Sequence, residues 1–273
     1  GLPKVVGYSL VGTVVGLAGF AGAVWPLQGT ALFLLELGVA IVLFEAGGRL
    51  PLGWFRHNPM VLVQSLVEST LTYFAVFWTM HWLDVPDPVA VPLALIAVAA
   101  SPAVLSRVAI DTRASGPVTE RAMTLATLNT FYALMLGYAQ AGLIERAPLG
   151  LFQKVYPAMV VVGLSFVVGA LMALALRSAL RVMSPTSENT SILLLAIIAA
   201  GAAVSTYFGG AAPLAALIGG VLLKLLNPRP WVWPRQLGTA SSLVTMLMFV
   251  LVSMVAAQGE WSLPVATTVL ALI

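Results

Sequence analysis

The chain of 273 residues is 60% hydrophobic and only 8% charged, with a mean hydropathy of +1.01, whereas about a quarter of the residues in a soluble domain are charged. This composition excludes an ordinary soluble domain, and the thirteen basic residues behind the net charge of +3 are too few to indicate a nucleic-acid partner. Because cysteine is absent and no catalytic constellation is recognisable, we expect no metal site, no cofactor and no enzymatic activity.

Apolar runs of about 20 residues recur along the chain, the length that a helix needs to cross roughly 30 Å of hydrocarbon. Strand-like alternation is absent from these runs, so we expect an all-α polytopic membrane protein with about ten transmembrane helices. The predicted spans are 3–22, 29–47, 59–82, 88–111, 118–142, 154–182, 188–207, 211–227, 237–257 and 262 onward. The chain begins without a methionine and ends inside the tenth run, so we expect a sequence clipped at both ends and C-terminally incomplete.

The basic residues predict how the spans are oriented. If the ten spans alternate across the bilayer, all but two of the thirteen basic residues fall in loops on one side, and the exceptions are Arg146 and Lys154. Such asymmetry marks the cytoplasmic side of a membrane protein. We therefore expect a multi-pass protein of the cell (inner, cytoplasmic) membrane, with the lipid bilayer as its first partner.

Four polar groups lie at a similar depth in four different spans. Each is roughly 9 to 11 residues from the predicted cytoplasmic end, which is about 15 Å at 1.5 Å per helical residue. These residues are Glu36, Glu68, Ser101 and Asn129. A carboxylate in mid-membrane costs roughly 2.5–3.5 kcal/mol and is a functional candidate by default.

The two acids have different surroundings in the sequence. Glu68 belongs to a polar stripe, Gln64/Ser65–Glu68–Thr72, whose helical spacing indicates a face turned into the bundle. Glu36 has no such stripe, and a buried, protonated acid bonded to neighbouring backbone explains it as well as a functional role does.

The fourth and fifth spans carry polar features of another kind. Pro102 removes a backbone donor and its ring clashes with the carbonyl of Val98, so we predict a break in the helix at 88–111. Such breaks coordinate ions in many secondary transporters, although a packing kink is the alternative. Asn129 lies on a stripe of small residues, where close packing with Asn as an interhelical hydrogen-bonding group needs no further function.

The first span begins PKVVGYSLVGTVVG and the eighth runs APLAALIGGVLLKL. Both have proline near the start and glycine further in, which indicates an internal repeat that the odd number of intervening helices would invert.

In these features the chain resembles the monovalent cation/proton antiporter superfamily, which includes sodium/proton exchangers and potassium-efflux antiporters. The resemblance runs in order through GLPKVVGYSLVG, ELGVAIVLFEAGGRL, ASPAVLSRVAIDTRASGPVTERAMTLATLNT, AAPLAALIGGVLLKLL and MLMFVLVSMV. It implies two inverted five-helix repeats that form a dimerisation part and a mobile core. The first repeat would be 1–142, the connecting helices 143–210 and an incomplete second repeat 211–273.

The resemblance also implies site residues. The broken fourth helix of that family carries a Thr/Ser/Asp-Pro pair, which Ser101-Pro102 matches, and the next helix carries an Asn-Asp or Asp-Asp pair, which falls on Asn129-Thr130. Some members use a carboxylate on the preceding helix, which Glu68 matches. This chain departs from the family at Thr130, which stands where the exchanging aspartate is expected. Threonine can ligate an ion but carries no charge near neutral pH.

Two functions follow from these residues. The first is a secondary transporter of a monovalent cation or other solute, with Glu68 as its titratable group and Ser101, Asn129 and Thr130 as neutral ligands. The alternative is a transport-inactive relative that serves as a structural or assembly subunit of a membrane complex. We expect a homodimer or such a subunit, and we expect Asn129 to bond either to Glu68 or to backbone freed near Pro102.

Overall fold

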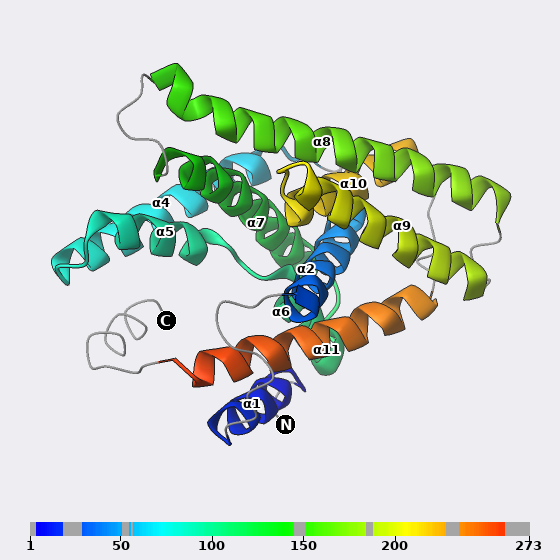
Figure 1. Ribbon diagram of the computed structural model, residues 1–273, viewed down its shortest axis with the longest axis horizontal. Coiled ribbons are helices and arrows are strands. Elements are labelled where there is room, and N and C mark those ends of the chain that lie inside the picture. The colour runs from blue at the N-terminus through cyan, green and yellow to red at the C-terminus, as the bar shows by residue number, and fades with distance from the viewer. Residues whose placement is uncertain are drawn as a thin grey trace.

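The computed structural model describes most of the chain as a bundle of α-helices (Figure 1). The described residues are 4–18, 29–50, 55, 57–144, 151–183, 188–227 and 235–259. Their helices are α1 (Lys4–Leu17), α2 (Gly29–Arg49), α4 (Met60–Trp82), α5 (Asp87–Val98), α6 (Pro102–Thr112), α7 (Pro117–Ile144), α8 (Leu151–Val182), α9 (Glu188–Tyr207), α10 (Ala212–Leu226) and α11 (Arg235–Ala257). The predicted all-α fold class is confirmed.

The predicted spans correspond to these helices one by one, except at two places. The run at 88–111 is divided between α5 and α6, and the run from 262 onward lies outside the described residues. Within the part described, four stretches are long and apolar enough to cross a membrane: Met60–Trp82, Asp87–Thr112, Tyr156–Val182 and Asn189–Tyr207. Three shorter apolar helices accompany them, Lys4–Leu17, Ala212–Leu226 and Ser242–Ala257.

Helices α2 and α10 cross at the centre of the bundle, and glycine makes the crossing close (Figure 1). Gly47 of α2 lies against the carbonyl oxygen of Leu217, and Gly220 of α10 lies against the carbonyl oxygen of Phe44. A β-carbon at either glycine would overlap these backbone atoms. Residues of α8 and α9 complete the main apolar core around this crossing.

A second close crossing joins α1 to α11, beside one another at the bottom of Figure 1. Gly12 lies against the carbonyl oxygen of Val250, and Gly16 lies against that of Met254. The Gly-x-x-x-Gly spacing thus serves backbone-to-backbone packing, as it commonly does in membranes.

Helices α4, α5 and α7 pack together away from α1, and the long α8 runs along α7, α9 and α10 (Figure 1). The predicted break lies within this group. Helix α5 ends at Val98, and Ala99 and Ser101 adopt extended backbone with ψ of 101° and 106°. Pro102 then opens α6 at a position where a missing N–H costs nothing, so the Pro-broken helix is confirmed.

Candidate functional site

Asn129 joins α7 to α4 through three hydrogen bonds. Its side-chain oxygen Oδ1 accepts from Ser65 Oγ at 2.8 Å and from Ser69 Oγ at 3.0 Å. Its amide nitrogen Nδ2 donates to Glu68 Oε1 at 3.4 Å. Asn129 is only 3% exposed, so the residue is directed into the bundle and not toward lipid.

Thr130 joins α7 to the break between α5 and α6. Its hydroxyl lies 2.6 Å from the carbonyl oxygen of Ala100 and 2.8 Å from that of Ala126, and its single hydrogen serves these two acceptors. Of the two partners we expected for Asn129, Glu68 is therefore the one it contacts. The backbone at the break is bonded by Thr130 instead.

The remaining predicted residues of α4 and the break lie at the edge of this cluster. The side chains of Glu68 and Ser101 are both exposed. Ser101 caps α6, since its Oγ accepts from the backbone N–H of Val104 at 3.4 Å. Gln64, in the same stripe as Glu68, is exposed and bonds to Arg121 of α7. The stripe is therefore divided, because Ser65 is buried in the α4–α7 contact whereas Gln64 and Glu68 are exposed at its border.

The sequence interpretation missed one residue of the site, Ser69. Ser65 and Ser69 are four residues apart and thus lie on one helix face, and both are buried. That spacing was the available signal, but two serines four residues apart in a membrane helix are too common to single out a site.

Glu36 does not join the cluster. It is half-buried on α2, within electrostatic range of Tyr138 on α7. Among the described residues, no hydrogen bond connects it to Glu68, Asn129 or Thr130. Of the four groups that we predicted at one depth, the structure therefore joins two, Glu68 and Asn129, whereas Ser101 caps α6 at the edge of the cluster and Glu36 lies apart from it.

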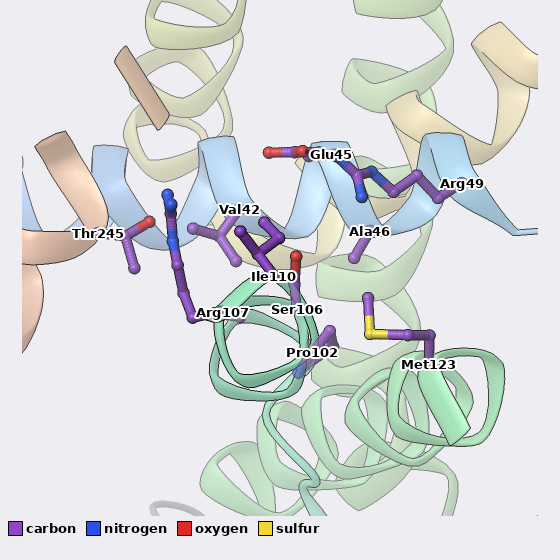
Figure 2. Close-up of a pocket in the computed structure, with 11 residues that line it drawn as sticks. Val42, Glu45, Ala46, Arg49, Pro102, Ser106, Arg107, Ile110, Met123 and Thr245 are labelled. Carbon is purple, nitrogen blue, oxygen red and sulfur yellow. Dashed lines mark hydrogen bonds and ion pairs between the residues drawn. The ribbon is translucent and has the colours of Figure 1, made fainter. Parts of the chain in front are cut away.

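Two adjoining cavities lead from the side predicted to be cytoplasmic toward the break. The smaller, about 110 Å³, lies between α2, α6, α7 and α11 and has Pro102 in its wall (Figure 2). The larger, about 670 Å³, extends from the 113–116 turn to Thr127. Arg49 lines both cavities and is ion-paired with Glu45.

Figure 2 shows Arg107 extending from α6 along Val42 of α2 toward Thr245 of α11. The wall of the smaller cavity is thus formed by α6 and Met123 of α7 on one side and by α2 and α11 on the other. The smaller cavity reaches the start of α6 at Pro102. Glu68, Asn129 and Thr130 thus form one polar cluster that joins α4, α7 and the break.

Comparisons with known proteins agree with this architecture. The sequence model of the family described as sodium/hydrogen exchanger, transmembrane, matches residues 1–273. Among solved structures, the chain is similar to the sodium/proton antiporter MjNhaP1 from Methanocaldococcus jannaschii, with a TM-score of 0.66 and 14% sequence identity. The similarity covers 94% of this chain and 64% of that antiporter, so the chain spans less than two thirds of its length. A comparison with curated protein sequences finds no match.

Proposed function

The chain belongs to the sodium/hydrogen exchanger family, as its sequence resemblance indicated, and from this premise we propose that it carries out exchange of a monovalent cation for a proton across a membrane. Members of this family are multi-pass integral membrane proteins that transport cations and protons, and not enzymes. In our proposal, Glu68 is the carboxylate that binds the cation and the proton in turn.

The observation that carries this proposal is the contact between Asn129 and Glu68 beside a broken helix. A polar amide that is 3% exposed donates to a carboxylate on the neighbouring helix at 3.4 Å. An acid within a membrane helix is costly, so its presence at such a position favours a function. The break adds extended backbone at Ala99 and Ser101, and such breaks in membrane helices coordinate ions in many secondary transporters.

The cavities support a route for the ion. They reach Pro102 and Thr127 from the side that the basic loops predict to be cytoplasmic. A protein open to this side would load or release its cation there, and exchange would require a second state open to the opposite side. We place the protein in the cytoplasmic membrane and expect it to act as a homodimer or within a larger complex.

The division of the chain into repeats is part of the same proposal. If 1–142 is one repeat and 211–273 begins another, α1 and α10 are the first helices of the two repeats, and α2 and α11 are the second helices. Helix α10 packs on α2 and α1 packs on α11, and glycine faces backbone at both crossings. Each first helix therefore packs on the second helix of the other repeat, and this symmetric arrangement supports the proposed division.

A transport-inactive structural or assembly subunit is the second candidate function. The observation that favours it is Thr130, which stands where the resemblance implies an aspartate. Its hydroxyl bonds to the backbone of Ala100 and Ala126, which is a structural use of the position. Such a subunit would keep the fold and the packing of α7 while lacking cation flux.

Flux measurements in proteoliposomes distinguish the two functions. We expect the wild-type protein to exchange sodium, lithium or potassium ions for protons, and we expect Glu68→Gln to abolish this exchange while the protein still folds. Asp87→Asn, which alters an exposed acid at the start of α5, is the matched control and should retain exchange. Absence of exchange in the wild type would favour the structural subunit, and unchanged exchange in Glu68→Gln would remove Glu68 from the mechanism.

A further inference from the structure

The amide of Asn129 is held in one orientation by two serines that the proposed function does not use. Ser65 and Ser69 are 0% and 8% exposed. Each hydroxyl has one hydrogen to donate, and a side-chain amide oxygen has two lone pairs. The contacts at 2.8 and 3.0 Å therefore occupy both lone pairs of Asn129 Oδ1.

Glu68 determines which way the amide faces. The NH₂ group of Asn129 faces Glu68 Oε1 at 3.4 Å and donates to it, and a carboxylate oxygen that accepts this bond requires the amide to lie this way round. Turning the amide over would direct its oxygen at the carboxylate oxygen, and the two acceptors would repel each other. The serines then supply the donors that the buried amide oxygen needs, because an unsatisfied polar atom in this environment is costly.

This orientation restricts what Asn129 can do. With both lone pairs of Oδ1 occupied, Asn129 presents N–H groups to the site and offers no free oxygen to a cation. Glu68 Oε1 already receives the amide, whereas Oε2 forms no hydrogen bond with the described residues. A cation would therefore meet a carboxylate from one side and an unfavourable N–H dipole from the other.

We propose that Ser65 and Ser69 are positioning residues that keep Asn129 from ligating the cation and so weaken cation binding at Glu68. This inference rests on the proposed function. Weak binding has a use in a carrier, because an ion that binds too tightly slows release and turnover. The two serines would thus limit the affinity of the site by fixing a neighbouring amide, without touching the ion.

The test is the double variant Ser65→Ala/Ser69→Ala in proteoliposomes. Loss of both hydroxyls frees Oδ1, so the amide can turn its oxygen toward a bound cation. We expect the KM for sodium ions, measured at alkaline pH where protons compete least, to fall roughly threefold to tenfold, which is the effect of one membrane-buried polar contact. We also expect kcat to fall, because release becomes slower.

Three controls separate positioning from a merely structural role. Ser65→Thr/Ser69→Thr keeps both hydroxyls and should restore the wild-type KM. Ser165→Ala removes a buried hydroxyl from α8, where it bonds to Val161 and Ala211, and should leave the KM unchanged. Sodium-induced thermal stabilisation of the purified protein measures binding without transport and should increase in the double alanine variant.

The outcomes are distinct. Suppose that the wild-type protein exchanges cations and that the KM of the double alanine variant is unchanged or raised. This result overturns the inference that the two serines position Asn129, and it leaves the proposed function intact. A wild-type protein that neither binds nor exchanges a cation overturns both. A lower KM in the double alanine variant that the threonine variant reverses supports the inference.

Discussion

Asp111, at the end of α6, accepts a hydrogen bond from the backbone N–H of Lys4, the first residue of α1, at 2.9 Å. The same carboxylate lies 3.8 Å from the Lys4 ammonium through its other oxygen. One side chain of the broken helix therefore caps another helix that packs mainly on α11. The cap satisfies an otherwise unpaired N–H and places a negative charge at the positive end of α1.

We predict that the cap contributes more to stability than the ion pair. Asp111→Ala should lower the free energy of unfolding by about 1 kcal/mol, the usual cost of losing a capping residue. Lys4→Ala keeps the backbone N–H and loses an ammonium whose side chain is 75% exposed, so its effect should stay below about 0.5 kcal/mol. Thermal melts in detergent measure both. If both variants lost the same free energy of unfolding, the ion pair and not the cap would account for the stabilisation by Asp111.

Gly220 provides a test of the central crossing. Gly220→Ala would direct a methyl group into the Phe44 carbonyl of α2, so α2 and α10 must separate, and overpacking of this kind costs typically 1–3 kcal/mol. Gly163→Ala in α8 is the matched control, because no atom lies within 4 Å of its new β-carbon. The control should be neutral or slightly stabilising. If both variants have the same melting temperature, α2 and α10 do not approach each other as closely as the structure shows.

The sequence predicted the helices and the break better than it predicted the site. The break follows from Pro102 alone, because proline lacks the N–H that a continuous helix needs. Depth in the membrane can also be counted along the chain, which grouped Glu36 with Glu68 and Asn129. Depth does not determine the rotation of each helix about its axis. That rotation is why Glu68 bonds to Asn129 whereas Glu36 does not join the cluster.

Ser69 and Thr130 illustrate what a single sequence cannot supply. A serine in a membrane helix most often bonds to its own backbone, so the bond from Ser69 to Asn129 depends on how α4 and α7 pack. Thr130 was expected as an ion ligand because of its position beside Asn129. Its bond to Ala100 requires the extended segment of the break to pass α7, which no local pattern encodes.

The orientation of the chain can be tested with single thiols, because the sequence contains no cysteine. Ser115 lies exposed in the turn before α7, and Asp87 lies exposed at the start of α5. From the distribution of basic loops we expect Ser115→Cys to react with a membrane-impermeant maleimide only from the cytoplasmic side, and Asp87→Cys only from the opposite side. Labelling of both thiols from one side would invalidate the predicted alternation of spans.

We predict that the hydroxyl of Thr130 stabilises the protein by bonding α7 to the break between α5 and α6. Thr130→Val keeps the shape of the side chain and removes the hydroxyl that bonds to Ala100 and Ala126. Interhelical bonds in membranes average roughly 0.6 kcal/mol and reach about 1.7, so thermal stability should decrease by an amount in that range. Thr130→Ser, which retains the hydroxyl, should recover most of the loss. Full stability in Thr130→Val would mean that the bond to Ala100 contributes nothing.

Asn129 gives the last prediction, because its three hydrogen bonds differ in kind. Asn129→Ala removes the acceptor for two serine hydroxyls and the donor to Glu68. The hydroxyls of Ser65 and Ser69 can then bond to helix carbonyls four residues back, so the loss of stability should be modest, about 1–2 kcal/mol.

Because the carboxylate that we propose for exchange remains in place, Asn129→Ala should keep measurable cation flux, whereas Glu68→Gln should not. The comparison requires both variants in the same proteoliposome assay, with thermal melts to establish that each has folded. A well-folded Asn129→Ala protein without any flux would make the amide itself essential. In that case the N–H donated to Glu68 would be a requirement for exchange, and the view of Asn129 as chiefly an interhelical contact would be wrong.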